Sequence, residues 1–180
     1  MANVSDSTFM KVFQEAPGDL GPLTDYKTVS DAIIKAIGQL SENIKLSHAC
    51  ALEAKEGSIS TFIYNNLLQT SHFGIGTYAA VLHLKAESEL VSDNDIHSLG
   101  KKLAQHVVGL NPKSIDTTEV TSSSEVLLKQ PFLLDNSLLV GELLERERVK
   151  VTSFVSYRLG EVTAVVDEDE CQFVSYNHST

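Results

Sequence analysis

The segment Gly74-x-Gly76-x-x-Ala79 has the spacing of a dinucleotide-binding fingerprint. In that motif a strand leads into the glycine turn, and the turn opens a helix whose N-terminal amide groups bind the phosphates. Here the glycines precede residues 77–86, whose alternation is typical of a strand. The pattern therefore predicts a hairpin loop that contains glycine. A glycine-rich phosphate loop ending in lysine and serine or threonine is also missing, so we do not expect the chain itself to bind GTP.

The six histidines and two cysteines form no recognisable metal or catalytic pattern. No two histidines have zinc-binding spacing, and Cys50 and Cys171 are predicted to be ordinary thiols. His48 interrupts an apolar strand face and is predicted to be partly buried and hydrogen-bonded. His106 falls near the end of a predicted helix, where a protonated imidazole is favoured by the helix dipole. We therefore predict no metal, no cofactor and no catalytic residue.

Two short segments carry side chains that suit a protein partner. Tyr64, Asn65 and Asn66 are predicted at the end of a strand, as a simple strand end or as part of a docking surface. Phe132 lies in the apolar loop 130–134 and has two interpretations. It packs across the sheet as core, or it is an exposed anchor for a partner. The sequence leaves both alternatives open.

Composition limits the class of protein. With 180 residues, 42% of them hydrophobic, the chain can bury one core or two small lobes. Its net charge of −10 argues against a nucleic-acid partner, which requires clustered Lys and Arg. No window approaches the roughly 20 apolar residues that cross a bilayer, so we expect a soluble protein. The first residues lack both the apolar segment of a secretory signal and the arginine-rich character of a mitochondrial transit peptide.

Hydrophobic periodicity predicts the elements that position these residues. A helix is predicted between Thr28 and Leu40, with Ser30 as its cap. A second helix begins after the cap Ser92 and ends near Asn111. Because short loops join consecutive strands, we expect antiparallel pairing. The strands between these two helices are predicted at 44–52, 59–68 and 77–86.

The stretch 127–161 completes the pattern. After the apolar loop, Asp135 or Ser137 is predicted to cap a third helix. A last strand follows and ends at Gly160. The apolar face of this helix is predicted to be Leu139, Val140, Leu143 and Leu144, and one face of the strand to be Val149, Val151, Val155, Tyr157 and Leu159.

These elements predict an α+β fold, in which a small antiparallel sheet of three to four strands packs with about three helices. Residues 1–27 are expected to be a loop or a flexible lead-in, and residues 28–161 the folded domain. Residues 162–180 are expected to form an acidic tail, in which the charge run at 167–170 is solvated.

Several segments together resemble the core domain of elongation factor Ts. Its closing part is similar to Leu-x-x-Gln130-Pro131-Phe132, a helix with Val-Gly-x-Leu-Leu, and the strand pattern Val-x-Phe-Val-x-Tyr-x-Leu-Gly-Glu. The resemblance covers residues 30–161, and the short connector 110–129 is similar to animal mitochondrial members. Further matching segments, in the family's order, are Ala36-Ile37-Gly38, Ser41-Glu42-Asn43-Ile44, Ala51-Leu52-Glu53, Gly76-x-Tyr78-x-Ala80-Val81-Leu82 and a helix ending in Gln105-His106-Val107-Val108-Gly109-Leu110-x-Pro112.

The resemblance implies a guanine-nucleotide exchange factor that binds elongation factor Tu one to one in mitochondria and promotes GDP release. It implies neither a homodimer nor covalent catalysis. Three features depart from the family: its N-terminal helical domain has no counterpart, its Thr-Asp-Phe-Val motif is missing, and its Tyr-x-His-Gly becomes Tyr64-Asn65-Asn66-Leu67. The alternative is therefore a docking or other interaction module without exchange activity. A third alternative is an unrecognised small α+β enzyme.

Overall fold

The computed structural model describes residues 28–46, 48–66, 68–69, 74–88, 90–116, 122–158, 161–165 and 171–177. The chain divides into two compact units, residues 1–53 with 172–180, and residues 54–171. The described part contains three α-helices and a four-stranded antiparallel sheet, so the predicted α+β class is confirmed. The boundary between the units falls inside the range 28–161 that the sequence predicted as one domain.

Within the described residues, the first unit contains one helix and a two-stranded sheet. Helix α2 (Val29–Leu40) begins after Thr28, whose hydroxyl oxygen accepts the amide of Asp31 at 3.1 Å. The predicted cap Ser30 was therefore wrong by two positions. Strand β1 (His48–Ala54) pairs with β10 (Cys171–Asn177). The range predicted as an acidic tail thus includes a strand, while its charge run at 167–170 lies outside the described residues.

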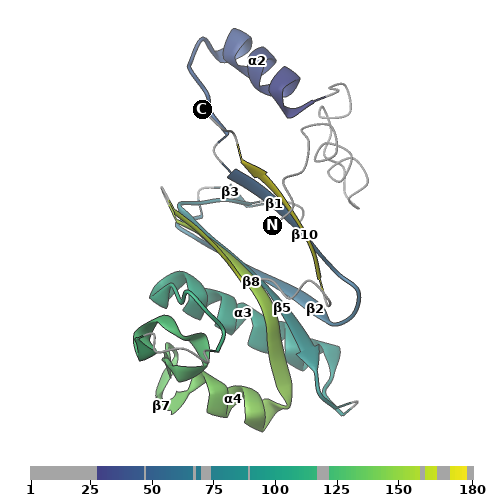
Figure 1. The fold of residues 1–180 in the computed structure, drawn as a ribbon, viewed down its shortest axis with the longest axis vertical. Helices are drawn as coiled ribbons and strands as arrows, with labels where there is room; N and C mark the ends of the chain where they lie inside the picture. The colour runs from purple at the N-terminus through teal and green to yellow at the C-terminus, as the bar shows by residue number, and fades with distance from the viewer. Residues whose placement is uncertain are drawn as a thin grey trace. The chain divides into compact units, whose positions relative to one another are not determined.

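A sheet with the strand order β2-β5-β8-β9 forms the frame of the second unit (Figure 1). Each neighbouring pair is antiparallel. The short connection predicted this for β2 with β5, whereas two helices separate β5 from β8. The central strands β5 and β8 are the most buried, and β2 and β9 form the two edges. The strands are β2 (Ser58–Tyr64), β5 (Tyr78–Ala86), β8 (Val149–Arg158) and β9 (Glu161–Val165).

A bulge in β8 changes which of its residues face the core. His83 pairs with Ser153 but Leu84 pairs with Val151, so one additional residue stands in β8 between them. Phe154 consequently lies opposite Leu82 and is fully buried in the same core cluster as Val151. The prediction that Val155 shares the face of Val151 was wrong, because simple alternation does not anticipate a bulge.

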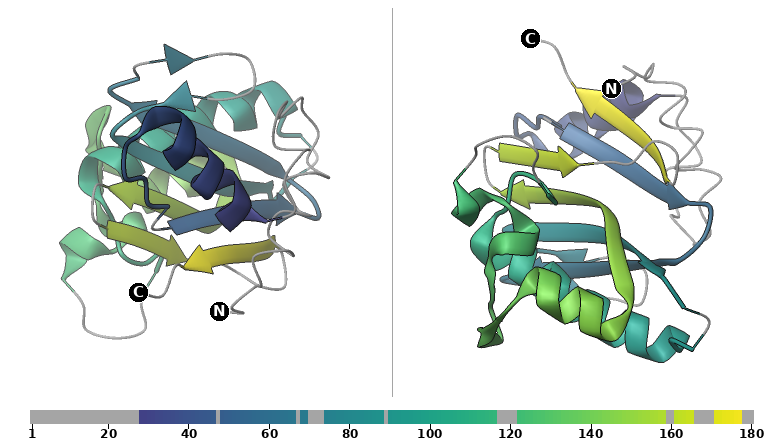
Figure 2. Two further views of the ribbon diagram at one scale, coloured as in Figure 1. Left: turned by 90° about the horizontal axis from the view of Figure 1, so that it is seen from above. Right: turned by 60° about the horizontal axis from the view of Figure 1, so that its bottom comes forward.

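Helix α3 (Asp93–Leu110) covers the core face of the sheet (Figure 2). Its predicted cap is confirmed, since the Ser92 hydroxyl accepts the amide of Asp95 at 3.2 Å. The helix ends at Asn111, which adopts the left-handed conformation with φ 48°. Its predicted stripe is buried and consists of Ile96, Leu99, Leu103 and Val107.

Helix α4 (Val140–Glu147) lies on the same side of the sheet as α3 (Figures 1 and 2) and begins later than predicted. Asp135 and Ser137 do not cap it, because β7 (Asp135–Leu139) pairs there with β6 (Pro131–Phe132). The carboxylate of Glu142 instead accepts the amide of Leu139 at 2.9 Å. Three of the four residues predicted for its apolar face are buried, namely Val140, Leu143 and Leu144.

Candidate protein-interaction surface

Tyr64, one of the predicted partner-binding residues, forms an exposed aromatic platform at the end of β2. It is the register partner of Tyr78 at the start of β5, and the two rings stack with centroids 5.8 Å apart and planes inclined by 26°. Tyr64 remains 53% exposed, whereas Tyr78 is half-buried and packs against the core. The platform is therefore supported from below and open above.

Arg158, the last residue of β8, supports the platform from the other side. Its guanidinium carbon lies 5.5 Å from the centroid of the Tyr78 ring. Its Nη2 donates to the carbonyl oxygens of Val108 at 2.7 Å and Gly109 at 3.2 Å. These carbonyls belong to the last turn of α3, which has no intrahelical donors for them and attracts positive charge. Arg158 thus joins the end of the sheet to the end of α3.

The two predicted asparagines follow Tyr64 at the neck of a hairpin. Asn65 adopts the left-handed conformation with φ 52°, and the carbonyl of Tyr64 accepts the amide of Thr77 at 3.0 Å. Gly76 passes so close that a side-chain carbon there would collide with Ile63 and with the Tyr64 carbonyl. Beyond this neck, β3 (Leu68–Gln69) pairs with β4 (Gly74–Ile75). Both asparagines are exposed beside Tyr64.

Phe132 is buried, at 6% exposure, so the core interpretation describes its position. Its ring stacks on that of His106, with centroids 5.9 Å apart. The next two residues form the turn between β6 and β7 and point their side chains outward, with Leu133 37% and Leu134 51% exposed. The exposed side chains of the apolar loop are therefore these two leucines, whereas Phe132, the residue singled out from the sequence, is buried.

His106 lies beneath this loop and is fully buried. Its Nε2 lies 2.8 Å from Oε1 of Gln130, and its Nδ1 accepts the amide of Leu133 at 3.1 Å. Gln130 in turn donates from Nε2 to the carbonyl of Ser124 at 2.5 Å. Burial lowers the pKa of His106 below its ordinary value, and the Gln130 hydrogen bond opposes this shift. The helix end would favour this ring if it were protonated, as the sequence suggested, but burial acts in the opposite direction.

The exposed side chains of Tyr64, Leu110, Leu133 and Leu134 form what we call the tyrosine–leucine surface. Contacts connect three of them, because Tyr64 stacks on Tyr78, Tyr78 lies under Arg158, and Arg158 binds the carbonyl of Gly109. Leu134 lines a separate hollow with Asp95, Ser98 and Leu99. A methyl group of Leu133 lies over Gly109, next to Leu110, which is 40% exposed. A hollow of about 540 Å³ is lined by Leu110, Ser124, Gln130, Pro131, Leu133 and Asn136.

The sequence analysis missed Leu110, Arg158 and the supporting role of Tyr78. One signal was present for the leucines, because a loop of consecutive apolar residues cannot turn all of them inward. Nothing in the spacing of Tyr78 and Arg158 indicated their meeting, since the bulge in β8 and the end of α3 determine it.

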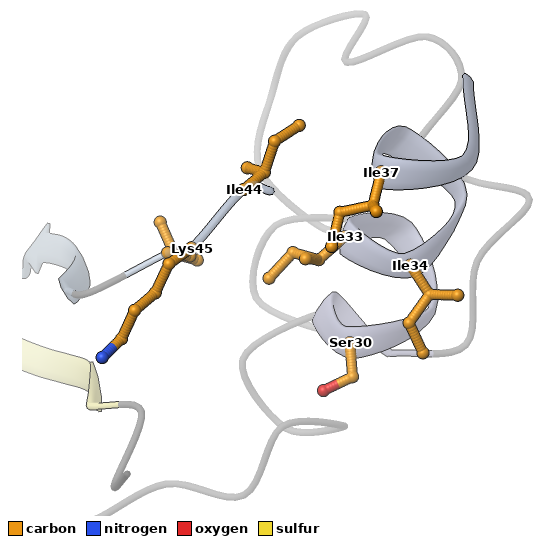
Figure 3. Close-up of a pocket in the computed structure, with 7 residues that line it drawn as sticks. Ser30, Ile33, Ile34, Ile37, Ile44 and Lys45 are labelled. Atoms are coloured by element: carbon orange, nitrogen blue, oxygen red, sulfur yellow. The ribbon is translucent and has the colours of Figure 1, made fainter. Parts of the chain in front are cut away.

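Other hollows in the molecule suit packing more than chemistry. In the first unit, about 300 Å³ lies between α2 and the segment 44–46, lined mainly by isoleucines; Figure 3 shows Ile33, Ile34 and Ile37 on the helix. Within the described residues, no group of three or more His, Cys, Asp or Glu could hold a metal ion. In that same part of the chain, no helix is long and apolar enough to cross a membrane.

Comparison with known proteins gives one family and several named relatives. The model of the family described as Elongation factor TS matches residues 3–125. This match begins and ends earlier in the chain than the resemblance over residues 30–161. A Nematostella vectensis protein named mitochondrial elongation factor Ts is 37% identical over 142 residues, which are 76% of this chain and 49% of that protein.

Two further relatives bear similar names. The Homo sapiens protein named mitochondrial elongation factor Ts is 28% identical over 74% of this chain and 42% of its own length. A Nitrobacter hamburgensis protein named elongation factor Ts is 26% identical over 79% of this chain and 58% of its own length. The chain therefore spans about half the length of the curated relatives that it matches.

Proposed function

The chain belongs to the elongation factor Ts family, of the mitochondrial type, and from this membership we propose that it binds elongation factor Tu and promotes the release of GDP during mitochondrial protein synthesis. The observation that carries the proposal is the family match over residues 3–125. The protein would change a binding equilibrium without forming or breaking a covalent bond. Its place of action would be the mitochondrion, the compartment in the names of its animal relatives.

The tyrosine–leucine surface supports the binding step. Its side chains are exposed; the Tyr64 ring stacks on Tyr78, and the backbone of Leu133 is hydrogen-bonded to the ring of His106. A side chain that is already ordered loses less conformational entropy on binding, and aromatic residues in this situation dominate many interfaces. Asn65 and Asn66 are exposed beside the platform, where a partner could reach them. Phe132 would contribute indirectly, by fixing the loop from the core side.

Exchange requires more than contact with the partner. An exchange factor releases GDP only if it binds the nucleotide-free partner more tightly than the GDP-bound partner, and the coupling between the two ligands is reciprocal. A surface that contacts both states equally would dock without releasing the nucleotide. The second candidate function is therefore a Tu-docking module, and the observation favouring it is that Tyr64-Asn65-Asn66-Leu67 stands where the family has Tyr-x-His-Gly.

The decisive experiment uses mitochondrial elongation factor Tu loaded with labelled GDP. Release is measured with and without the full chain, and complex formation is measured in parallel by sedimentation, where a one-to-one complex is expected. Faster release supports exchange. Complex formation with unchanged release leaves the docking function alone. The absence of a complex, with a folded chain, contradicts both.

A further inference from the structure

We propose that His106 is a positioning residue of the tyrosine–leucine surface: Nδ1 of its neutral ring holds the backbone of Leu133, so that Leu133 and Leu134 face outward. The hydrogen-bonded connection itself concerns this chain alone. Its consequence for binding to elongation factor Tu rests on the proposed function.

The hydrogen bonds around His106 leave its ring one protonation state. A backbone amide only donates, so the contact of Leu133 N with Nδ1 requires a lone pair on Nδ1. The proton of the neutral ring is therefore on Nε2, which donates to Oε1 of Gln130. The amide group of Gln130 points the other way and donates to Ser124. Each polar atom in this series has a single role.

A charged ring would not fit this arrangement. An imidazolium carries a proton on both nitrogens, so its Nδ1 hydrogen would face the hydrogen of the Leu133 amide. The groups that meet the ring are the uncharged side chains of Gln130 and Phe132. The charged residues closest along the chain, Lys102 on α3 and Lys129 beside Gln130, are exposed. Protonation would therefore break the bond that holds Leu133.

This bond ties the turn to the buried core, in addition to the pairing of β6 with β7. Pro131 has no amide hydrogen, and Leu133 and Leu134 form the turn at which β6 pairs with β7. Apolar side chains at such a turn gain free energy by folding inward, away from water. The bond from Leu133 to the buried ring fixes the backbone and so keeps both leucines at the surface.

Two substitutions separate the two bonds of the ring. His106→Asn places a carbonyl oxygen near the position of Nδ1, so Leu133 keeps its acceptor. His106→Gln places an amide near the position of Nε2, so Leu133 loses its acceptor. Both variants remove the ring that stacks on Phe132. The loss of packing is therefore similar in the two variants, and they differ in the hydrogen bond that each one keeps. His97→Gln, on the exposed face of the same helix, is the control for replacing a histidine in α3.

The first measurement is the protection of the Leu133 amide against hydrogen exchange, followed by NMR on the full chain without a partner. We expect His106→Gln to lower this protection by about tenfold or more and His106→Asn by less than about threefold. Affinity for elongation factor Tu is expected to follow the same order. Equal protection in the two variants, or wild-type protection in both, would overturn the proposal. If wild-type chain binds no Tu, the proposed function fails while amide protection still decides the role of His106.

A second measurement needs no variant and remains available if the substituted chains do not fold. The protection of the Leu133 amide in the wild-type chain is followed as the pH is lowered and the His106 ring is observed by NMR. We expect protection to fall as the ring gains its second proton, while the amide of Asn111, which donates to Val107, stays protected. Constant Leu133 protection through that titration would overturn the proposal.

Discussion

Arg158 lies over the ring of Tyr78, with its guanidinium carbon 5.5 Å from the ring centroid. The same guanidinium donates to the carbonyl of Val108 in the last turn of α3. One side chain thus contacts the end of the sheet, the end of α3 and the ring under Tyr64. Its replacement should therefore lower both the stability of the fold and the affinity for a partner.

Replacing Arg158 with lysine should lower the free energy of unfolding by about 1–2 kcal/mol, since an ammonium cannot stack on Tyr78 and bridge two carbonyls together. Urea unfolding measures the change. The control is Arg146→Lys, because Arg146 is exposed and its guanidinium lies 3.0 Å from the carboxylate of Glu147. We expect less than about 0.5 kcal/mol for that control. Equal losses in the two variants would contradict the bridging role of Arg158.

Tyr64→Ala should weaken binding to elongation factor Tu by about tenfold or more, because it removes the aromatic platform. Tyr64→Phe keeps the ring that stacks on Tyr78 and should retain most of the affinity. Calorimetry with purified Tu gives both dissociation constants. Leu90→Ala is the matched control, since Leu90 is 87% exposed and follows the opposite end of β5. If Leu90→Ala lost as much affinity for elongation factor Tu as Tyr64→Ala, the binding site would not be specific to the tyrosine platform.

Phe132→Ala should cost about 3–5 kcal/mol of stability, the range for removing a buried aromatic side chain. Leu134→Ala should leave stability within about 0.5 kcal/mol, because Leu134 is half exposed, yet it should weaken Tu binding. Denaturant midpoints and binding constants are measured on the same preparations. If Phe132→Ala kept full stability and lost only binding, Phe132 would be an anchor for the partner after all.

Acid should destabilise the fold through His106. Its folded-state pKa lies below the ordinary histidine value of 6.5, because burial disfavours the charged ring. Between those two values the unfolded state binds more protons, so stability is complete above about pH 6.5 and falls as the pH drops toward the folded pKa. Urea midpoints from about pH 8 to about pH 5 measure the slope. It should flatten in His106→Asn and persist in His97→Gln, and an unchanged slope in His106→Asn would contradict the assignment.

Two helical glycines should respond to alanine in opposite directions. A side-chain carbon at Gly100 would collide with Ser60 and Leu84, because α3 lies directly on the sheet there. Gly100→Ala should therefore destabilise by about 1–3 kcal/mol. Gly38 in α2 has nothing within 4 Å of that position, so Gly38→Ala should stabilise its helix by about 0.5–1 kcal/mol. Melting curves of both variants test the pair, and a destabilised Gly38→Ala would contradict the open surface there.

Local signals in the sequence predicted much of this fold. Ser92 and the left-handed Asn111 bound α3 as expected, because cap preferences depend on residues within one turn. The alternation of residues 77–86 marked the central strand β5 correctly. The same local logic failed at Asp135, which has the chemistry of a cap but lies in a strand paired with Phe132. A competing tertiary partner decided that case, and cap preference cannot detect such a partner.

The candidate surface was only partly predictable. Tyr64 stood out as an aromatic residue at a strand end, where it is exposed, and its role in binding a partner stays a prediction. Phe132 was named as core or anchor in the apolar loop 130–134, and its neighbours Leu133 and Leu134 carry the exposed area. Their orientation follows from the bond between Leu133 and His106, two residues far apart in the chain, and no spacing rule links them.

The pairing of β5 with β8 also determines the order in which the second unit can assemble. Ala80 meets Ser156 only after two helices have intervened, whereas β2 and β5 are joined by a short connection. Closing a long loop costs more entropy than closing a short one, so the β2–β5 hairpin can form early and the central pairing comes late. During synthesis, α3 leaves the ribosome before residues 149–158, so it can pack on β2 and β5, its main neighbours in the sheet, before β8 is available. The slow step of folding is therefore expected to be the docking of β8, which also brings Arg158 to the end of α3.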